Sequence, residues 1–119
     1  MFNKLLRKKG KVFIIGFHVT PLENTIMPPN LAGAYVDCFS KGETYVEATK
    51  NSLNKLAKDG LYPEEILEPI LELEITEWST YVKERWPDYI DGISNQKEFE
   101  NTVLSGGVVY GPFGSYDPQ

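Results

Sequence analysis

The sequence predicts a single α+β domain, with an antiparallel or mixed sheet of about four strands and two or three helices packed mainly on one face. Its length of 119 residues fits one domain of common size. Its 41% hydrophobic and 24% charged residues are ordinary for a folded protein. Residues 33–60 decide the class, because a buried strand, a tight turn, a capped helix and a glycine stop follow one another there.

Two strands are expected before the first helix. Residues 11–20 are β-branched, aromatic and apolar on both faces, as in a central strand. A proline-marked loop follows at residues 21–31, and residues 33–40 then alternate between two faces. One face carries Ala34, Val36 and Cys38, and the other carries Tyr35, Asp37 and Phe39. The closeness of the two segments in sequence predicts that they pair antiparallel.

The first long helix is expected to begin after Thr44. Thr44 and Glu47 have the spacing of a capping box, in which each side chain bonds a free backbone amide at the helix start. Apolar positions then recur at helical spacing: Val46, Thr49, Leu53, Leu56 and Ala57. Gly60 is placed to end the helix in the left-handed conformation.

The segment after Gly60 predicts a turn and then a strand. Pro63 is suited to the first position of a short helical turn at residues 63–67. Residues 70–75 alternate between apolar and acidic side chains, as in a half-buried strand. The chain between the second strand and this one is long enough for a crossover through the helix.

Two helices and a short strand complete the prediction. Residues 76–86 and 95–105 are expected to be helical, the second beginning at Asn95 with capping spacing to Glu98. Residues 108–110 form a last strand. The single domain spans residues 1–119, with a basic leader at residues 1–10 and an irregular tail at residues 111–119.

Charge is divided unevenly along the chain. The net charge of −5 includes five bases and no acid in the first eleven residues. Seven acids without a base then occur together: Asp59, Glu64, Glu65, Glu68, Glu72, Glu74 and Glu77. An acidic body disfavours nucleic acid and favours a basic protein partner. The expected partner-binding residues are the six glutamates of this run together with Trp78 and Trp86, whereas a solvated acidic face and aromatic core packing are the plainer explanations.

The sequence gives limited information about the cellular compartment of the protein. A single cysteine excludes an internal disulfide and fits the cytoplasm. No apolar run reaches the roughly 18–20 residues of a membrane span. The basic and then apolar N-terminus has the outline of a signal peptide, but Gly16, His18 and Pro21 interrupt it, so a first strand is expected there and a targeting segment is the alternative.

Residues that could carry catalysis are sparse. His18 is the only histidine, and it lies in an apolar strand where a packed histidine is the plainer explanation. Cys38 is expected to be a buried structural thiol. No metal-ligand spacing occurs, and the glycine-rich residues 106–114 lack the lysine of a phosphate-binding loop. The sequence therefore predicts no enzyme, no cofactor and no metal, and leaves His18 acting with Asp37 as the catalytic alternative.

Two families share parts of these patterns. Residues 42–56, GETYVEATKNSLNKL, resemble the G-D-T-x-x-E-A-x-x-N-A segment of HicB-type antitoxin domains, and the matching residues are Gly42, Thr44, Glu47, Ala48 and Asn51. The chain also resembles small bacterial ferredoxin-like domains of uncharacterised function. There the matching stretches are the strand at 33–38, the helix and glycine at 47–60, and the late helix and strand at 95–110.

Together these features predict a non-enzymatic, protein-binding inhibitor. The expected class is a bacterial immunity protein or antitoxin that neutralises a basic, nuclease-type toxin through an acidic surface. Its resemblance to small bacterial domains supports this class by analogy alone. The alternative is a small ligand-binding or regulatory domain that forms a homodimer through an exposed sheet edge.

Overall fold

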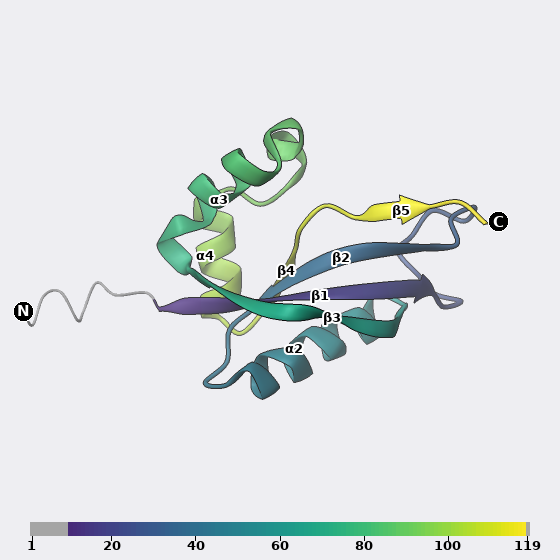
Figure 1. The fold of residues 1–119 in the computed structure, drawn as a ribbon, viewed down its shortest axis with the longest axis horizontal. Helices are drawn as coiled ribbons and strands as arrows, with labels where there is room; N and C mark the ends of the chain where they lie inside the picture. Colours follow the sequence, from purple (N-terminus) through teal and green to yellow (C-terminus); the bar gives the residue numbers. More distant parts are fainter. Residues whose placement is uncertain (1–9, 119) are drawn as a thin grey trace, which may run out of the picture.

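Strand β1 lies at the centre of a five-stranded sheet in the computed structural model, which describes residues 10–118. The order is β3-β1-β2-β4, and β5 pairs with another part of β2 (Figure 1). All pairings are antiparallel, which confirms the α+β class. The strands are β1 (Lys11–Pro21), β2 (Gly33–Ser40), β3 (Leu61–Glu74), β4 (Val108–Tyr110) and β5 (Gly114–Tyr116). The predicted basic leader lies outside the described residues except for Gly10.

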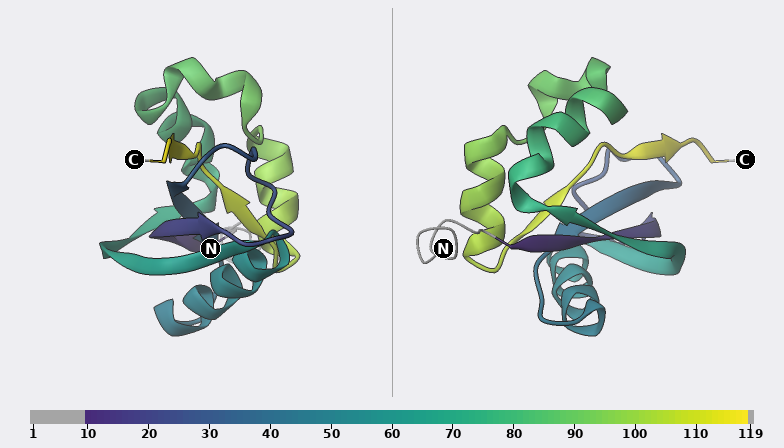
Figure 2. Two further views of the ribbon diagram at one scale, coloured as in Figure 1. Left: turned by 90° about the vertical axis from the view of Figure 1, so that its right-hand side faces the viewer. Right: turned by 60° about the vertical axis from the view of Figure 1, so that its left-hand side comes forward.

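Helices cover both faces of the sheet, which differs from the expected packing mainly on one face. On one face α2 (Tyr45–Lys58) closes a core that includes Ile15, Phe17 and Leu56. On the other, α3 (Trp78–Arg85) and α4 (Gln96–Leu104) close a second core around Phe39 (Figures 1 and 2). β1 serves both cores because successive side chains of a strand point to opposite faces.

The start and end of α2 agree with the sequence. Thr44 Oγ1 accepts the backbone N–H of Glu47 at 3.2 Å. Glu47 accepts the backbone N–H of Glu43 rather than that of Thr44, so the box closes one residue earlier than its usual form. Gly60 has φ +71°, and a Cβ there would lie 2.6 Å from the backbone of Thr25, so glycine is required at this turn.

β3 is one strand of 14 residues, so the predicted helical turn at residues 63–67 is wrong. The strand pairs with β1 along almost its whole length, with irregularities between Ile14 and Gly16 and between His18 and Val19. β3 lies at the edge of the sheet, where prolines are tolerated because their missing N–H groups need no partner. Pro63 therefore continues an edge strand instead of starting a helix.

The last third of the chain follows the predicted order with two additions, a 3-10 segment and a short strand. The predicted helix at 76–86 is a 3-10 turn, η1 (Ile75–Glu77), followed by α3. A second 3-10 segment, η2 (Pro87–Gly92), leads to α4, whose Asn95–Glu98 capping box is complete. The tail expected to be irregular contains β5, which pairs with β2. Within residues 10–118, no helix has both the length and the apolar character needed to cross a bilayer.

Candidate functional site

The acidic run lies mainly on the edge strand β3. Five exposed glutamates lie on β3: Glu64, Glu65, Glu68, Glu72 and Glu74. The sixth, Glu77, is exposed in η1. Residues opposite one another on neighbouring strands share a face. Glu72 and Glu74 lie opposite Phe13 and Lys11, on the α2 face, whereas Glu65 lies opposite His18 on the other face. The acids therefore flank the edge from both sides rather than forming one patch.

Two of these glutamates have partners within the domain. Lys11 Nζ lies 2.6 Å from Glu72 Oε1, and this contact raises the pKa of the lysine. Thr20 Oγ1 donates to Glu64 Oε2 at 2.8 Å. Glu68 and Glu72 border an open hollow of about 450 Å³ beside Tyr45 at the start of α2. Within residues 10–118, Lys11 is the only base that forms an ion pair with this edge, so the edge keeps an excess of negative charge.

Trp78 is fully buried, which removes it from the predicted partner-binding surface. Its ring stacks on Phe99 at 4.1 Å between centroids, and its Nε1 donates to the Ser94 carbonyl at 2.8 Å. Trp86 is partly buried against Phe39. Both tryptophans thus contribute to the second core, which is the plainer explanation that the sequence also allowed.

His18 belongs to a cluster of three rings on the face opposite α2. It stacks on Tyr35 at 4.8 Å between centroids, and its Nε2 lies 2.6 Å from the Tyr116 hydroxyl. Tyr116 lies opposite Gly33, where a Cβ would collide with its phenol oxygen. The glycine thus leaves room for the β5 tyrosine to reach His18. Sequence reasoning missed this cluster because β5 was not predicted.

Asp37 occupies the same face but is not paired with His18. In the register of β1 and β2, Asp37 lies opposite Gly16, whereas His18 lies opposite Tyr35. Burial raises the pKa of the Asp37 carboxyl, and Arg85 opposes that shift. The only hydrogen bond found for the His18 side chain, within residues 10–118, is to Tyr116. Within residues 10–118, His18 therefore has no hydrogen bond to a carboxylate.

Cys38 is fully buried and poorly suited to nucleophilic chemistry. Burial raises the pKa of its thiol to about 12, although a hydrogen bond with Ser52 acts in the opposite direction. The reactive form of a cysteine is the thiolate, which is scarce at neutral pH when the pKa is that high. Cys38 is a core residue, as the sequence predicted.

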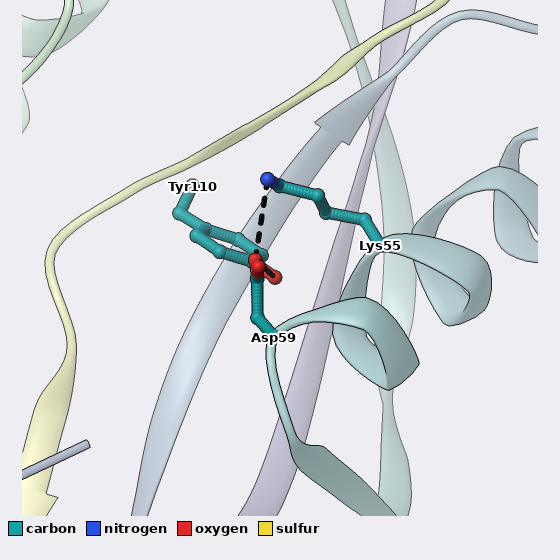
Figure 3. Close-up of polar contacts among 3 residues, drawn as sticks. All are labelled: Lys55, Asp59 and Tyr110. Carbon is teal, nitrogen blue, oxygen red and sulfur yellow. Dashed lines mark hydrogen bonds and ion pairs between the residues drawn. The ribbon is translucent and has the colours of Figure 1, made fainter. Parts of the chain in front are cut away.

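A third feature, absent from the sequence predictions, joins the end of α2 to β4. Figure 3 shows Lys55 and Asp59 converging on Tyr110. Tyr110 Oη donates to Asp59 Oδ2 at 2.7 Å, and Lys55 Nζ lies 3.2 Å from the same oxygen. Burial first, and then the Asp59 contact, raise the pKa of the Tyr110 phenol. Lys55 and Tyr110 border an open hollow of about 520 Å³, whose wall also includes Phe113.

Comparison with known proteins adds no further evidence. A scan of protein-family models, a search of curated proteins and a search of solved structures each found no match to this chain. The resemblances to HicB-type antitoxins and ferredoxin-like domains therefore stay predictions. Within residues 10–118, no three His, Cys, Asp or Glu side chains are grouped so that they could hold a metal ion.

Proposed function

We propose that this protein is a non-enzymatic, protein-binding inhibitor of the bacterial immunity or antitoxin class. In this proposal it acts in the cytoplasm and neutralises a basic, nuclease-type toxin through the acidic edge strand β3. The observation that supports it is the placement of five exposed glutamates on one edge strand, only one of them in a described ion pair. Negative charge on an exposed surface attracts a basic partner and speeds its association.

Edge protection is the competing explanation of the same residues. Proteins place charges, prolines and bulges on edge strands to prevent pairing with other chains, and β3 has all three features. Pro63 and Pro69 cannot donate backbone hydrogen bonds, and the register of β3 is irregular. The proposed partner therefore contacts the glutamate side chains rather than adding a strand to the sheet.

Charge reversal with a matched control separates the two explanations. The test variant changes four edge acids to lysine: Glu64, Glu65, Glu68 and Glu74. The control makes the same change in net charge at four exposed acids away from β3: Glu23, Glu84, Asp88 and Asp91. Binding is measured by calorimetry against a basic protein isolated as a partner from the native host.

The edge variant is expected to bind at least about fourfold more weakly than the control, since each exposed ion pair contributes roughly 0.2–1 kcal/mol and four of them would be lost. Weaker binding at higher salt is expected for the unchanged protein. Equal affinities of the two variants would reject the proposed surface. A homodimer that buries this edge, detected by sedimentation and lost in the edge variant alone, would favour the homodimeric alternative.

A second candidate function is small-ligand binding at the Tyr110 hollow. The observation that favours it is the size of about 520 Å³, within the range of small-molecule sites. Phe113 and Pro112 supply apolar surface there, and Lys55 supplies a cation. A fragment screen by NMR that shifts the resonances of β4 and α2, and loses those shifts in Phe113→Ala, would support this candidate. A screen without such shifts would reject it.

A further inference from the structure

The three-ring cluster lies on a part of the sheet that the helices leave open. Tyr35 is 49% exposed although it is part of β2, as the third residue of the strand. α3 and α4 pack over the other end of the same face, where Phe39 is fully buried. In Figure 1, β5 and the adjacent end of β2 extend away from these helices. An exposed tyrosine held in place by two neighbouring rings is a preformed surface rather than part of a core.

The cluster is continuous across three strands. Tyr35 of β2, His18 of β1 and Glu65 of β3 lie side by side in the register of the sheet. The ring of Tyr116 completes a triangle, 5.8 Å from His18 and 6.0 Å from Tyr35 between centroids. Aromatic rings and a carboxylate are thus presented together on one face.

Carboxylates border the rings on two sides. Glu65 lies opposite His18 on β3. Asp37 lies opposite Gly16, and a Cβ built on Gly16 would lie 3.1 Å from an Asp37 carboxylate oxygen, so that carboxylate leans toward β1 two residues before His18. There is no lysine or arginine between residues 12 and 40, and Arg85 is the one base near Asp37 in the part of the chain that the structure describes.

We propose that this cluster, defined by His18, Tyr35, Tyr116 and Glu65, binds an arginine side chain of a basic partner protein. A planar guanidinium is attracted to aromatic rings and donates hydrogen bonds to a carboxylate at the same time. Lysine offers the charge without the planar stacking surface, so arginine is the better occupant. The inference rests on the proposed function, because it identifies where part of the basic partner is held.

A short peptide provides the probe. The untagged protein is titrated with the peptide Gly-Arg-Gly-Arg-Gly while the ring protons of His18, the only histidine, are followed by NMR. Peptides with citrulline or lysine in place of arginine are the matched probes. Citrulline keeps the shape and removes the charge, whereas lysine keeps the charge and removes the planar donor group. The expected order of affinity is arginine, then lysine, then citrulline.

Two variants locate the binding. Tyr35→Ala is expected to weaken arginine-peptide binding about two- to fivefold, the usual effect of one exposed cation–π contact. Glu65→Gln is expected to weaken it by a similar factor and to reduce its salt dependence. Tyr89→Ala, at an exposed tyrosine of η2, is the control and should leave binding unchanged. Thermal melting checks that each variant is folded.

The outcomes separate this inference from the proposed function. Movement of the His18 signals that needs about two- to fivefold more peptide in Tyr35→Ala than in Tyr89→Ala supports the cluster. If the peptide binds without moving these signals, or binds Tyr35→Ala as it binds Tyr89→Ala, the cluster is not the arginine site. The proposed function would still stand in that case if reversal of the β3 acids weakened partner binding. If that reversal also had no effect, both proposals would fail.

Discussion

Removal of one hydroxyl group, in Tyr110→Phe, tests how the end of α2 is joined to the sheet. The substitution keeps the edge-on contact of this ring with Phe113, at 5.3 Å between centroids. It deletes the 2.7 Å hydrogen bond to Asp59. Because the substitution keeps the apolar contacts of the ring, the change in the free energy of unfolding reports mainly the loss of that hydrogen bond.

The expected loss follows from the surroundings of the bond. A hydrogen bond to a charged group contributes about 1.5–3 kcal/mol to stability. Tyr110 is only partly buried, and Asp59 keeps its contact with Lys55 at 3.2 Å, so its carboxylate is not left unpaired. We therefore expect a loss of about 1–2 kcal/mol, which lowers the melting temperature by roughly 4–8 °C in a domain of this size.

Alkaline pH gives a second measure of the same contact. The pKa of the Tyr110 phenol is raised in the folded protein, chiefly by burial. The folded state therefore keeps this proton at pH values where the unfolded chain has begun to release it. The stability that results is complete below the ordinary tyrosine pKa of about 10 and falls as pH rises above it. This extra loss, up to about 1.4 kcal/mol per pH unit, should be absent from Tyr110→Phe.

Urea denaturation followed by circular dichroism, at pH 7 and at pH 10 to 11, measures both effects. Tyr89→Phe is the matched control, because its hydroxyl is exposed and forms no described hydrogen bond. A double-mutant cycle with Asp59→Ala, which removes the acceptor, should give a coupling of about 1–2 kcal/mol. The reasoning is refuted if Tyr110→Phe and Tyr89→Phe have the same stability and the same alkaline dependence.

Four further predictions concern buried groups. Cys38, whose thiol pKa is raised to about 12, should resist alkylation at pH 8 until the protein unfolds, so fast labelling without denaturant would contradict its burial. Ser40→Ala removes a buried hydrogen-bond donor and should lower the free energy of unfolding, measured by urea titration, by about 1–3 kcal/mol. An unchanged urea midpoint would contradict this prediction. Trp78→Ala should lower the free energy of unfolding by about 3–5 kcal/mol or prevent folding, and a variant as stable as the unchanged protein would contradict the burial of this residue. Gly33→Ala should displace Tyr116, seen as a shift of the histidine ring signals, and unshifted signals would show that the glycine is not needed.

Short-range features were predictable from the sequence. The two helix starts at Thr44 and Asn95 depend on side chains that bond backbone amides three residues away. The end of α2 at Gly60 depends on the positive φ angle of this one residue, which glycine adopts readily. These interactions involve neighbours in the chain, so a pattern of a few residues is enough to predict them.

The form of β3 was not predictable in the same way. Pro63 at the start of a helical turn and Pro63 in an edge strand are both compatible with the local sequence, and pairing with β1 decides between them. β5 is similar, because residues 114–116 become a strand only by pairing with β2, about 80 residues earlier in the chain. Long-range backbone pairing thus selects among conformations that a short segment leaves open.

For the candidate site, the sequence determined composition and the tertiary structure determined position. The sequence alone showed an excess of acid after Gly60 and a single histidine and cysteine, because charge and residue type need no coordinates. Only the folded chain decided that the glutamates flank both faces of one edge and that Trp78 is buried. It also brought Tyr116 to His18, 98 residues away in sequence. The reason is physical: side-chain exposure and contact depend on which strands pair and which helices cover them.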